Sequence, residues 1–372
     1  MNNYKLRAYE AVCIVLTILL INLVLQVPSI LISTTGSATL INILYISVLT
    51  LFFFFIIYGI SSIFAGLDII DISNYLGGKF LKILVGTLYI LFIFLTSSVI
   101  IRLFAESLSL IYFSHININV IILIFIIASG IINYFDFRSI CRLNIIIIPI
   151  MLFSIIFLYF SSLNNYTVER VFPLLGYGLK STFLTGFSNI FSFGGIFLIF
   201  LISPLLSSKS EFKKVGIFSI SLYGLFLILC VSALLFSFPQ IKNTASPLSL
   251  YLLARQISLG IYIQSVDAIF LLIWIPFLLS YLSIKLYFAL SIFKKISNIK
   301  YSSGMIYNFC SILFIITILS RNIIEINLFT NEFYKYLIIG FVFIFSFMIL
   351  VLALIKKLFR KIIHKEDKLS NV

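Results

Sequence analysis

Arg102 and Glu106 are oppositely charged side chains that lie four residues apart inside a long apolar run. At this spacing on a helix, the two residues share one face and can form an ion pair. Ionisable residues on a membrane-spanning helix are costly and often functional, so the pair is a candidate gate over a binding pocket. Arg102 also follows Lys82 by twenty residues, about 30 Å of helix, which fits an anchor at the membrane interface as well.

Gly194 and Gly195 stand in the middle of a later apolar run. Glycine weakens a helix, and an interrupted helix frees backbone groups that can hold a small polar ligand. Glycines within spans also permit close helix packing, so the pair has two interpretations. The first apolar run has a weaker interruption, where Asn22 and Gln26 precede Pro28. These residues predict a ligand pocket near the bilayer centre, with the stronger break at the glycines.

Hydroxyl and carboxylate side chains add candidates for contacts with a ligand. Thr96 and Ser97 lie on the same apolar run as Arg102, and Ser192 precedes the glycine pair. Hydroxyl groups on spans also commonly bond to their own helix or to a neighbour. Asp267 opens a later apolar run. There it could contact a ligand, or serve as a helix-start carboxylate favoured by the helix dipole.

The remaining reactive residue types do not form a catalytic or metal-binding pattern. The four cysteines are far apart and mostly inside apolar runs, with no CxxC pair, and the two histidines lie in a loop and in the tail. Neither arrangement suggests a disulfide framework or a metal site. The acidic residues are mostly single groups at the ends of apolar runs, whereas catalysis needs a nucleophile with a base, or paired carboxylates. We therefore expect no enzyme activity, no metal and no cofactor.

The composition indicates an integral membrane protein. Hydrophobic residues make up 62% of the 372 positions and charged residues only 10%, too little polar surface for a soluble globule of this size. The net charge of +14 could suggest nucleic acid, but the basic residues are spread over the ends of the apolar runs and the tail. Attraction to anionic lipid headgroups at the cytoplasmic face explains them more simply, so no nucleic-acid partner is expected.

The apolar runs predict an all-α polytopic protein with about ten transmembrane helices. About 20 residues of helix cross a hydrocarbon core of about 30 Å, and strands in lipid would leave backbone groups unsatisfied. No soluble domain fits between the runs. The predicted spans are 8–32, 39–61, 83–110, 117–134, 143–161, 183–204, 215–238, 265–290, 304–322 and 334–356.

Lys and Arg are concentrated in every second gap between these spans. Positive residues near span ends resist translocation, so this alternation predicts both termini in the cytoplasm, with 205–214 and 291–303 inside and 161–182 and 239–262 outside. Five spans per half is an odd number, which implies an inverted repeat with halves of about 8–161 and 183–356. Residues 1–358 then form a single transmembrane domain, and 359–372 form a basic cytoplasmic tail.

Short motifs follow one another along the chain in a recognisable order. Together they resemble the spore germination B subunits, the amino-acid-permease-like membrane subunits of nutrient germinant receptors, which belong to the APC superfamily. The residues that carry this resemblance are Phe172–Leu179 (similar to "RPVLGEGL"), Leu76–Lys79, Arg102–Glu106, Tyr134 with Arg142, and Ile257–Gly260 with Asp267 and Trp274. The resemblance covers nearly the whole chain.

The resemblance implies a subunit of the inner spore membrane that senses a nutrient, such as an amino acid. It further implies an A-type subunit and a lipoprotein C-type subunit as partners. The chain departs from the family pattern at Asn22, where the family often has a GxG-type break, and at Ile196, where it often has an acidic residue. At the entrance of span eight, Ser265 replaces a basic residue.

A free-standing proton- or sodium-coupled amino-acid transporter is the alternative function on the same scaffold. A proton-coupled transporter is expected to keep an ionisable residue near the membrane centre. The centres of predicted spans one, six and eight carry none, and this absence favours the sensor. The sequence does not name the ligand.

Overall fold

The computed structural model describes residues 5–113, 115–238, 249–257, 265–299, 304–319 and 333–370, with side chains up to residue 360. Within these residues every regular element is helical, and an isolated bridge joins Leu6 to Leu206. Seven helices are long and apolar enough to cross a membrane, and three shorter helices are also apolar. Each of the ten predicted spans overlaps helix in the described part of the chain. The predicted loop 239–262 lies largely outside it, as do Ser258–Gly260 of the span-eight motif.

The first half of the chain contains six α-helices and one short 3-10 turn. A two-residue interruption at Leu25 and Gln26 divides the first predicted span into two helices. The elements are α1 (Ala8–Val24), α2 (Val27–Thr35), η1 (Gly36–Ala38), α3 (Thr39–Ile63), α4 (Ile69–Ile111), α5 (Ile118–Ile132) and α6 (Phe137–Ser161).

The second half departs further from regular α-helix. Span six begins as a π-helix, η4 (Lys180–Leu184), continues as a 3-10 helix, η5 (Thr185–Leu198), and ends in α7 (Ile199–Ile202) and η6 (Ser203–Leu205). Two short 3-10 turns precede it, η2 (Leu163–Asn165) and η3 (Val168–Val171). The other elements are α8 (Lys209–Ser237), α9 (Ser249–Gln256), α10 (Asp267–Ser297), α11 (Gly304–Ile318), α13 (Lys335–Ile338), η9 (Ile339–Phe345) and α14 (Ser346–Ser370).

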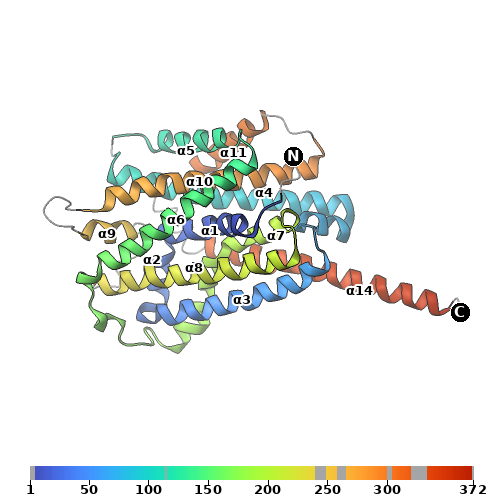
Figure 1. The fold of residues 1–372 in the computed structure, drawn as a ribbon, viewed down its shortest axis with the longest axis horizontal. Helices are drawn as coiled ribbons and strands as arrows, with labels where there is room; N and C mark the ends of the chain where they lie inside the picture. Colours follow the sequence, from blue (N-terminus) through green and yellow to red (C-terminus); the bar gives the residue numbers. More distant parts are fainter. Residues whose placement is uncertain are drawn as a thin grey trace.

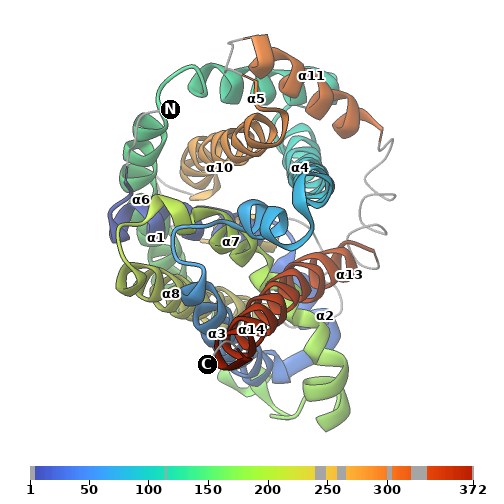
Figure 2. The same ribbon diagram turned by 90° about the vertical axis from the view of Figure 1, so that its right-hand side faces the viewer.

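The long helices lie side by side along the long axis of the molecule, and α14 projects beyond the bundle at one end (Figure 1). Seen end-on, α1 and α7 occupy the interior, with α4 and α10 on one side and α3 and α8 on the other (Figure 2). Burial agrees with this view, because most of α1 and all of residues 189–202 of span six are buried. These two segments are therefore the core around which the other helices pack.

Two lysine side chains of α14 bond to backbone carbonyls at the end of the bundle where α14 projects. Inside α4, Gly77 and Gly78 have non-helical backbone angles, with φ of +69° at Gly78, and this kink frees carbonyl groups. The Lys356 ammonium donates to the carbonyls of Tyr75 at 3.0 Å and Leu76 at 2.7 Å. Lys357 donates to the carbonyl of Ile63 at 2.8 Å. We call this end, which also carries Lys294 and Lys295 of α10, the basic end.

Candidate functional site

The interruption of span one lies at Leu25 and Gln26. Pro28 stands at the start of α2, and because proline has no N–H it cannot donate to the carbonyl of Val24 as a continuing helix requires. Gln26 is half-buried at the N-terminal end of α2. Asn22, also half-buried, donates to the carbonyl of Ile18 at 3.5 Å. The sequence thus located this break correctly and underrated it relative to the glycines of span six.

A buried polar network connects α2, α3 and span six. The Asn42 amide donates to the carbonyls of Thr182 at 2.8 Å and Gly186 at 3.0 Å, where the π-helix passes into the 3-10 helix. Its oxygen accepts from the Asn189 amide at 2.8 Å, and Asn189 also donates to the Thr34 hydroxyl at 2.9 Å. Asn42 and Asn189 are both fully buried. The network satisfies backbone groups that the irregular helix would otherwise leave unpaired.

The glycines of span six serve close packing in this structure. A Cβ atom on Gly194 would lie 2.3 Å from Ile338 of α13, and one on Gly195 would lie 2.9 Å from Leu19 of α1. The backbone at both residues is helical, within η5, and Ser192 donates to the carbonyl of Asn189 at 2.8 Å. The glycines therefore bring α1 and α13 against span six. Their role in binding a ligand stays a prediction.

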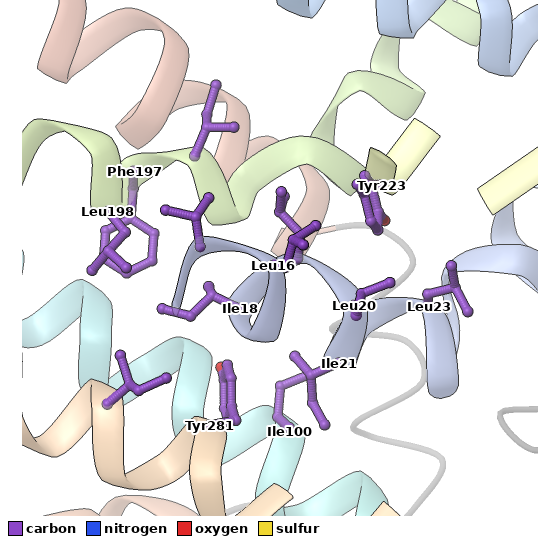
Figure 3. Close-up of a cluster of buried hydrophobic side chains, with 14 of the residues drawn as sticks. Leu16, Ile18, Leu20, Ile21, Leu23, Ile100, Phe197, Leu198, Tyr223 and Tyr281 are labelled. Atoms are coloured by element: carbon purple, nitrogen blue, oxygen red, sulfur yellow. The ribbon is translucent and has the colours of Figure 1, made fainter. Parts of the chain in front are cut away.

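Side chains from α1, η5, α4 and α10 converge on one apolar interior (Figure 3). Ile18, Ile100, Phe197 and Tyr281, which come from these four elements, are all buried. These side chains make the interior between the four elements apolar.

Lys285 of α10 reaches into this interior and is a buried ionisable residue that the sequence analysis did not weigh. It is 3% exposed and lies three residues beyond Leu282, the midpoint of the 31-residue helix. Its ammonium donates to the hydroxyl of Thr96 on α4 at 2.7 Å. Ser97, the next residue on α4, is also buried. The structure thus brings Thr96, a predicted site residue, into contact with a lysine that the sequence reasoning missed.

Arg102 and Glu106 form the predicted ion pair on α4. The guanidinium Nη2 lies 2.7 Å from Glu106 Oε1, and Nε donates to the same oxygen at 3.0 Å. Both side chains are buried, with 6% and 9% of their surfaces exposed. The pair is therefore enclosed by neighbouring helices, one and a half to three turns along α4 from Thr96 and Ser97.

Asp267 is the first residue of α10 and accepts hydrogen bonds from three hydroxyl groups. The donors are Ser265 at 2.6 Å, Tyr251 of α9 at 2.9 Å and Tyr112 at 3.4 Å. Burial and the hydrogen bond to Asp267 raise the pKa of the Tyr251 hydroxyl to about 12. Tyr251 therefore stays a hydrogen-bond donor at neutral pH. The arrangement joins α9 and α4 to the start of α10, about five helical turns before Lys285.

A cavity of about 530 Å³ opens at the basic end, between the end of span six and the end of α10. Beside it, Lys295 forms ion pairs with Asp68, at 2.7 Å, and with Asp71. Burial raises the pKa of Asp68, although Lys295 opposes this effect. Among the described residues, no group of three or more His, Cys, Asp or Glu side chains could hold a metal ion. The lining residues are Asp68, Leu201, Pro204, Leu205, Tyr287, Phe288, Ser291, Ile292, Lys294, Lys295, Asn298 and Ile299.

Solved structures of transporters have a similar fold. A Na⁺-coupled sialic acid symporter in a substrate-bound, outward-open state matches with a TM-score of 0.59 and 12% identity, over 94% of this chain and 76% of that one. A mutant manganese transporter of Eremococcus coleocola matches with a TM-score of 0.54 and 14% identity, over 93% of this chain and 76% of that one. The fold thus defines the class: an all-helical, polytopic integral membrane protein similar to transporters of the LeuT fold.

A family model described as "Spore germination protein" matches residues 5–326. The chain belongs to the spore germination protein family. This confirms the assignment made from the motifs in the sequence. No curated protein sequence matches the chain.

Proposed function

We propose that the protein is the membrane subunit of a spore nutrient germinant receptor. It binds a small nutrient, most simply an amino acid, between its helices, and triggers germination together with an A-type and a lipoprotein C-type subunit. The observation that carries the proposal is the family match over residues 5–326. The role is one of binding and signalling, without a chemical reaction.

The proposed topology has ten crossings in two inverted halves, with both termini in the cytoplasm and anionic lipids at the basic end. The LeuT-like fold supports it, as does the alternation of basic residues along the chain. In this arrangement α1 with α2, and η5 with α7, are the first spans of the two halves. Gly195 packs these two segments directly against each other through Leu19. The inner membrane of the spore is the proposed location.

Two features support a nutrient site where these segments meet. Span one is broken at Gln26, and span six is 3-10 helical over Thr185–Leu198, a geometry that often marks a hinge within a longer helix. A nutrient triggers a response only if it favours one arrangement of the helices over another. Segments with irregular backbone, held by a few side-chain bonds such as those of Asn42, are suited to such a change.

Reconstitution tests the proposal. The full chain is placed in lipid vesicles, alone and with its A-type and C-type partners, and each of the twenty labelled amino acids is offered with and without an imposed proton or sodium gradient. We expect saturable binding of at least one amino acid without accumulation inside the vesicles. We expect a conformational response only in the complex. Absence of binding to either preparation would contradict the proposal.

A second candidate function is a proton- or sodium-coupled amino-acid transporter. Lys285 favours it, because an ionisable group inside the helix bundle is what a proton-coupled carrier requires. Gradient-driven accumulation by the isolated chain in the same vesicles would establish the transporter and overturn the sensor. The matched control is the Lys285→Met variant, which lacks the buried ionisable group at position 285.

A further inference from the structure

We infer that the Lys285 ammonium is the group that binds the carboxylate of a small organic ligand within the bundle. The inference rests on the proposed function, because it names the chemical class of the nutrient. It also identifies the residue that selects it.

Lys285 has more hydrogen-bond donors than oxygen acceptors around it. A lysine ammonium carries three N–H donors, and the oxygen it contacts is the Thr96 hydroxyl at 2.7 Å. Thr96 in turn donates to the carbonyl of Phe92 at 2.7 Å, so its oxygen is free to accept from Lys285. The other faces of the ammonium meet the rings of Phe197, Tyr281 and Phe92, with centroids at 4.5, 5.4 and 5.8 Å.

The ion pairs in the described part of the chain leave Lys285 without a carboxylate. They join Arg102 to Glu106, and Lys295 to Asp68 and Asp71. A buried charge is costly unless it is paired and hydrogen-bonded. Attraction between the ammonium and the aromatic rings offsets only part of that cost. An incoming carboxylate would supply the missing charge and accept the remaining N–H groups.

The cavity at the basic end is lined by residues of α10 and of span six that lie one helical turn from Lys285 and from Phe197. Phe288, one helical turn beyond Lys285 on α10, lines the cavity, and so does Leu201, one turn beyond Phe197 of span six. The lining also contains Lys294, Lys295 and Asp68. Lys295 pairs with Asp68 and Asp71, and Lys294 has no ion pair among the described residues. Movement of Phe288 and Leu201 would join the cavity to Lys285.

The aromatic surroundings indicate an organic anion instead of an inorganic one. Three rings and the apolar residues Ile18 and Ile100 form the neighbouring interior (Figure 3). Burial of a ligand's carbon skeleton against these apolar side chains is favourable and offsets part of the cost of desolvating its carboxylate. Chloride and phosphate have no carbon skeleton and would be desolvated without this gain. A ligand with a carboxylate at one end and a short apolar part fits both features.

The test measures melting temperatures of the purified full chain in detergent, for the wild type, Lys285→Met, Lys285→Arg and Lys82→Met. Lys82 is the matched control, since it is a half-buried lysine on α4 away from the cluster. The probes are each of the twenty amino acids, propionate as the acid without an amine, ethylammonium as the amine without an acid, and chloride. The unliganded proteins are measured first.

We expect the unliganded Lys285→Met variant to melt at the wild-type temperature or above it, because an apolar side chain of similar length replaces an uncompensated buried charge. An amino acid and propionate should stabilise the wild type and the Lys82→Met variant, and ethylammonium should not. In Lys285→Met the apparent affinity should fall about tenfold or more. Lys285→Arg should retain part of it.

Four results would overturn the inference. The unliganded Lys285→Met variant could melt well below the wild type, or chloride could stabilise the wild type as strongly as propionate does. No probe could have any effect, or an amino acid could stabilise Lys285→Met and the wild type equally; this last result would leave the proposed function standing. Stabilisation by propionate but by no amino acid, lost in Lys285→Met, would remove the amino-acid nutrient and keep the role of Lys285.

Discussion

Asn42 shows how one side chain can hold an irregular helix in place. Its amide donates to two carbonyls of span six and accepts from Asn189, all in a fully buried position. Gly186 is required beside it, because a Cβ there would lie 2.5 Å from the Asn42 amide nitrogen. The residue therefore sets both the backbone geometry of span six and its distance from α3.

We expect Asn42→Ala to lower the thermal stability of the protein markedly. The substitution leaves buried carbonyls without a donor, at a cost of about 1–3 kcal/mol for each unsatisfied group. Thermal melting of the purified protein in detergent measures the effect. Asn22→Ala is the matched control, because Asn22 is half-buried and donates a long hydrogen bond of 3.5 Å to a carbonyl of its own helix. Equal melting temperatures for the two variants would refute the view that Asn42 stabilises span six.

At the residue scale, the sequence predicted contacts within one helix better than contacts between helices. The Arg102–Glu106 pair follows from spacing alone, because both partners lie on one helix. Lys285 was missed because the predicted span 265–290 placed it near a helix end, whereas α10 continues to Ser297 and makes it nearly central. Its partner Thr96 lies 189 positions away in the chain, and such a pairing depends on tertiary packing.

Among the elements, the kink of α4 is the clearest case of a backbone that requires glycine. Gly78 has φ of +69° and ψ of −161°, a region that is essentially restricted to glycine. We expect Gly78→Ala to cost about 1–3 kcal/mol in stability. A melting curve measures it, and an unchanged curve would show that the kink can relax.

Gly59→Ala is the control for that measurement. Gly59 lies within α3, and a Cβ there would meet nothing within 4 Å. Alanine is favoured over glycine inside a helix by about 0.8–1.0 kcal/mol. The control should therefore be neutral or slightly stabilising, which separates the loss of a special backbone angle from the general effect of replacing a glycine.

The sequence predicted the elements well and their interruptions only in part. Apolar runs fixed the approximate ranges of the helices, since length and hydropathy are local properties. Pro28 marked a real break through its missing N–H. The glycines of span six, expected to unwind it, are packed against Ile338 and Leu19. A glycine that permits a break and a glycine that permits a contact look the same until the neighbouring helix is known.

For the whole molecule, orientation is the property that a labelling experiment can measure directly. Ser207 and Ile299 are exposed near the basic end, and Asn164 and Leu174 are exposed in the connection before span six. Single cysteines at these positions, in a chain lacking its four native cysteines, are treated with a membrane-impermeant thiol reagent from one side. We expect the first two to label from the cytoplasmic side and the other two from the opposite side. Labelling of all four from one side would contradict the ten-span topology.

The class of fold could be predicted because a bilayer restricts the possible structures so strongly. Only helices and closed barrels satisfy the backbone in lipid, and basic residues report orientation. The site could not be predicted to the same extent, because its geometry depends on side chains from α4, span six and α10 meeting in the interior. The family assignment came from short motifs, which carry information that composition does not.

The hydrogen bonds of the α14 lysines can form only late in the synthesis of the chain. Lys356 and Lys357 bond to carbonyls made 280 to 294 residues earlier. At about 5–20 residues per second, a ribosome needs roughly 15–60 s to add that length. These contacts at the basic end can thus form only after α14 has been synthesised. A chain that stops before Lys356 leaves the carbonyls of Tyr75 and Leu76 without these donors.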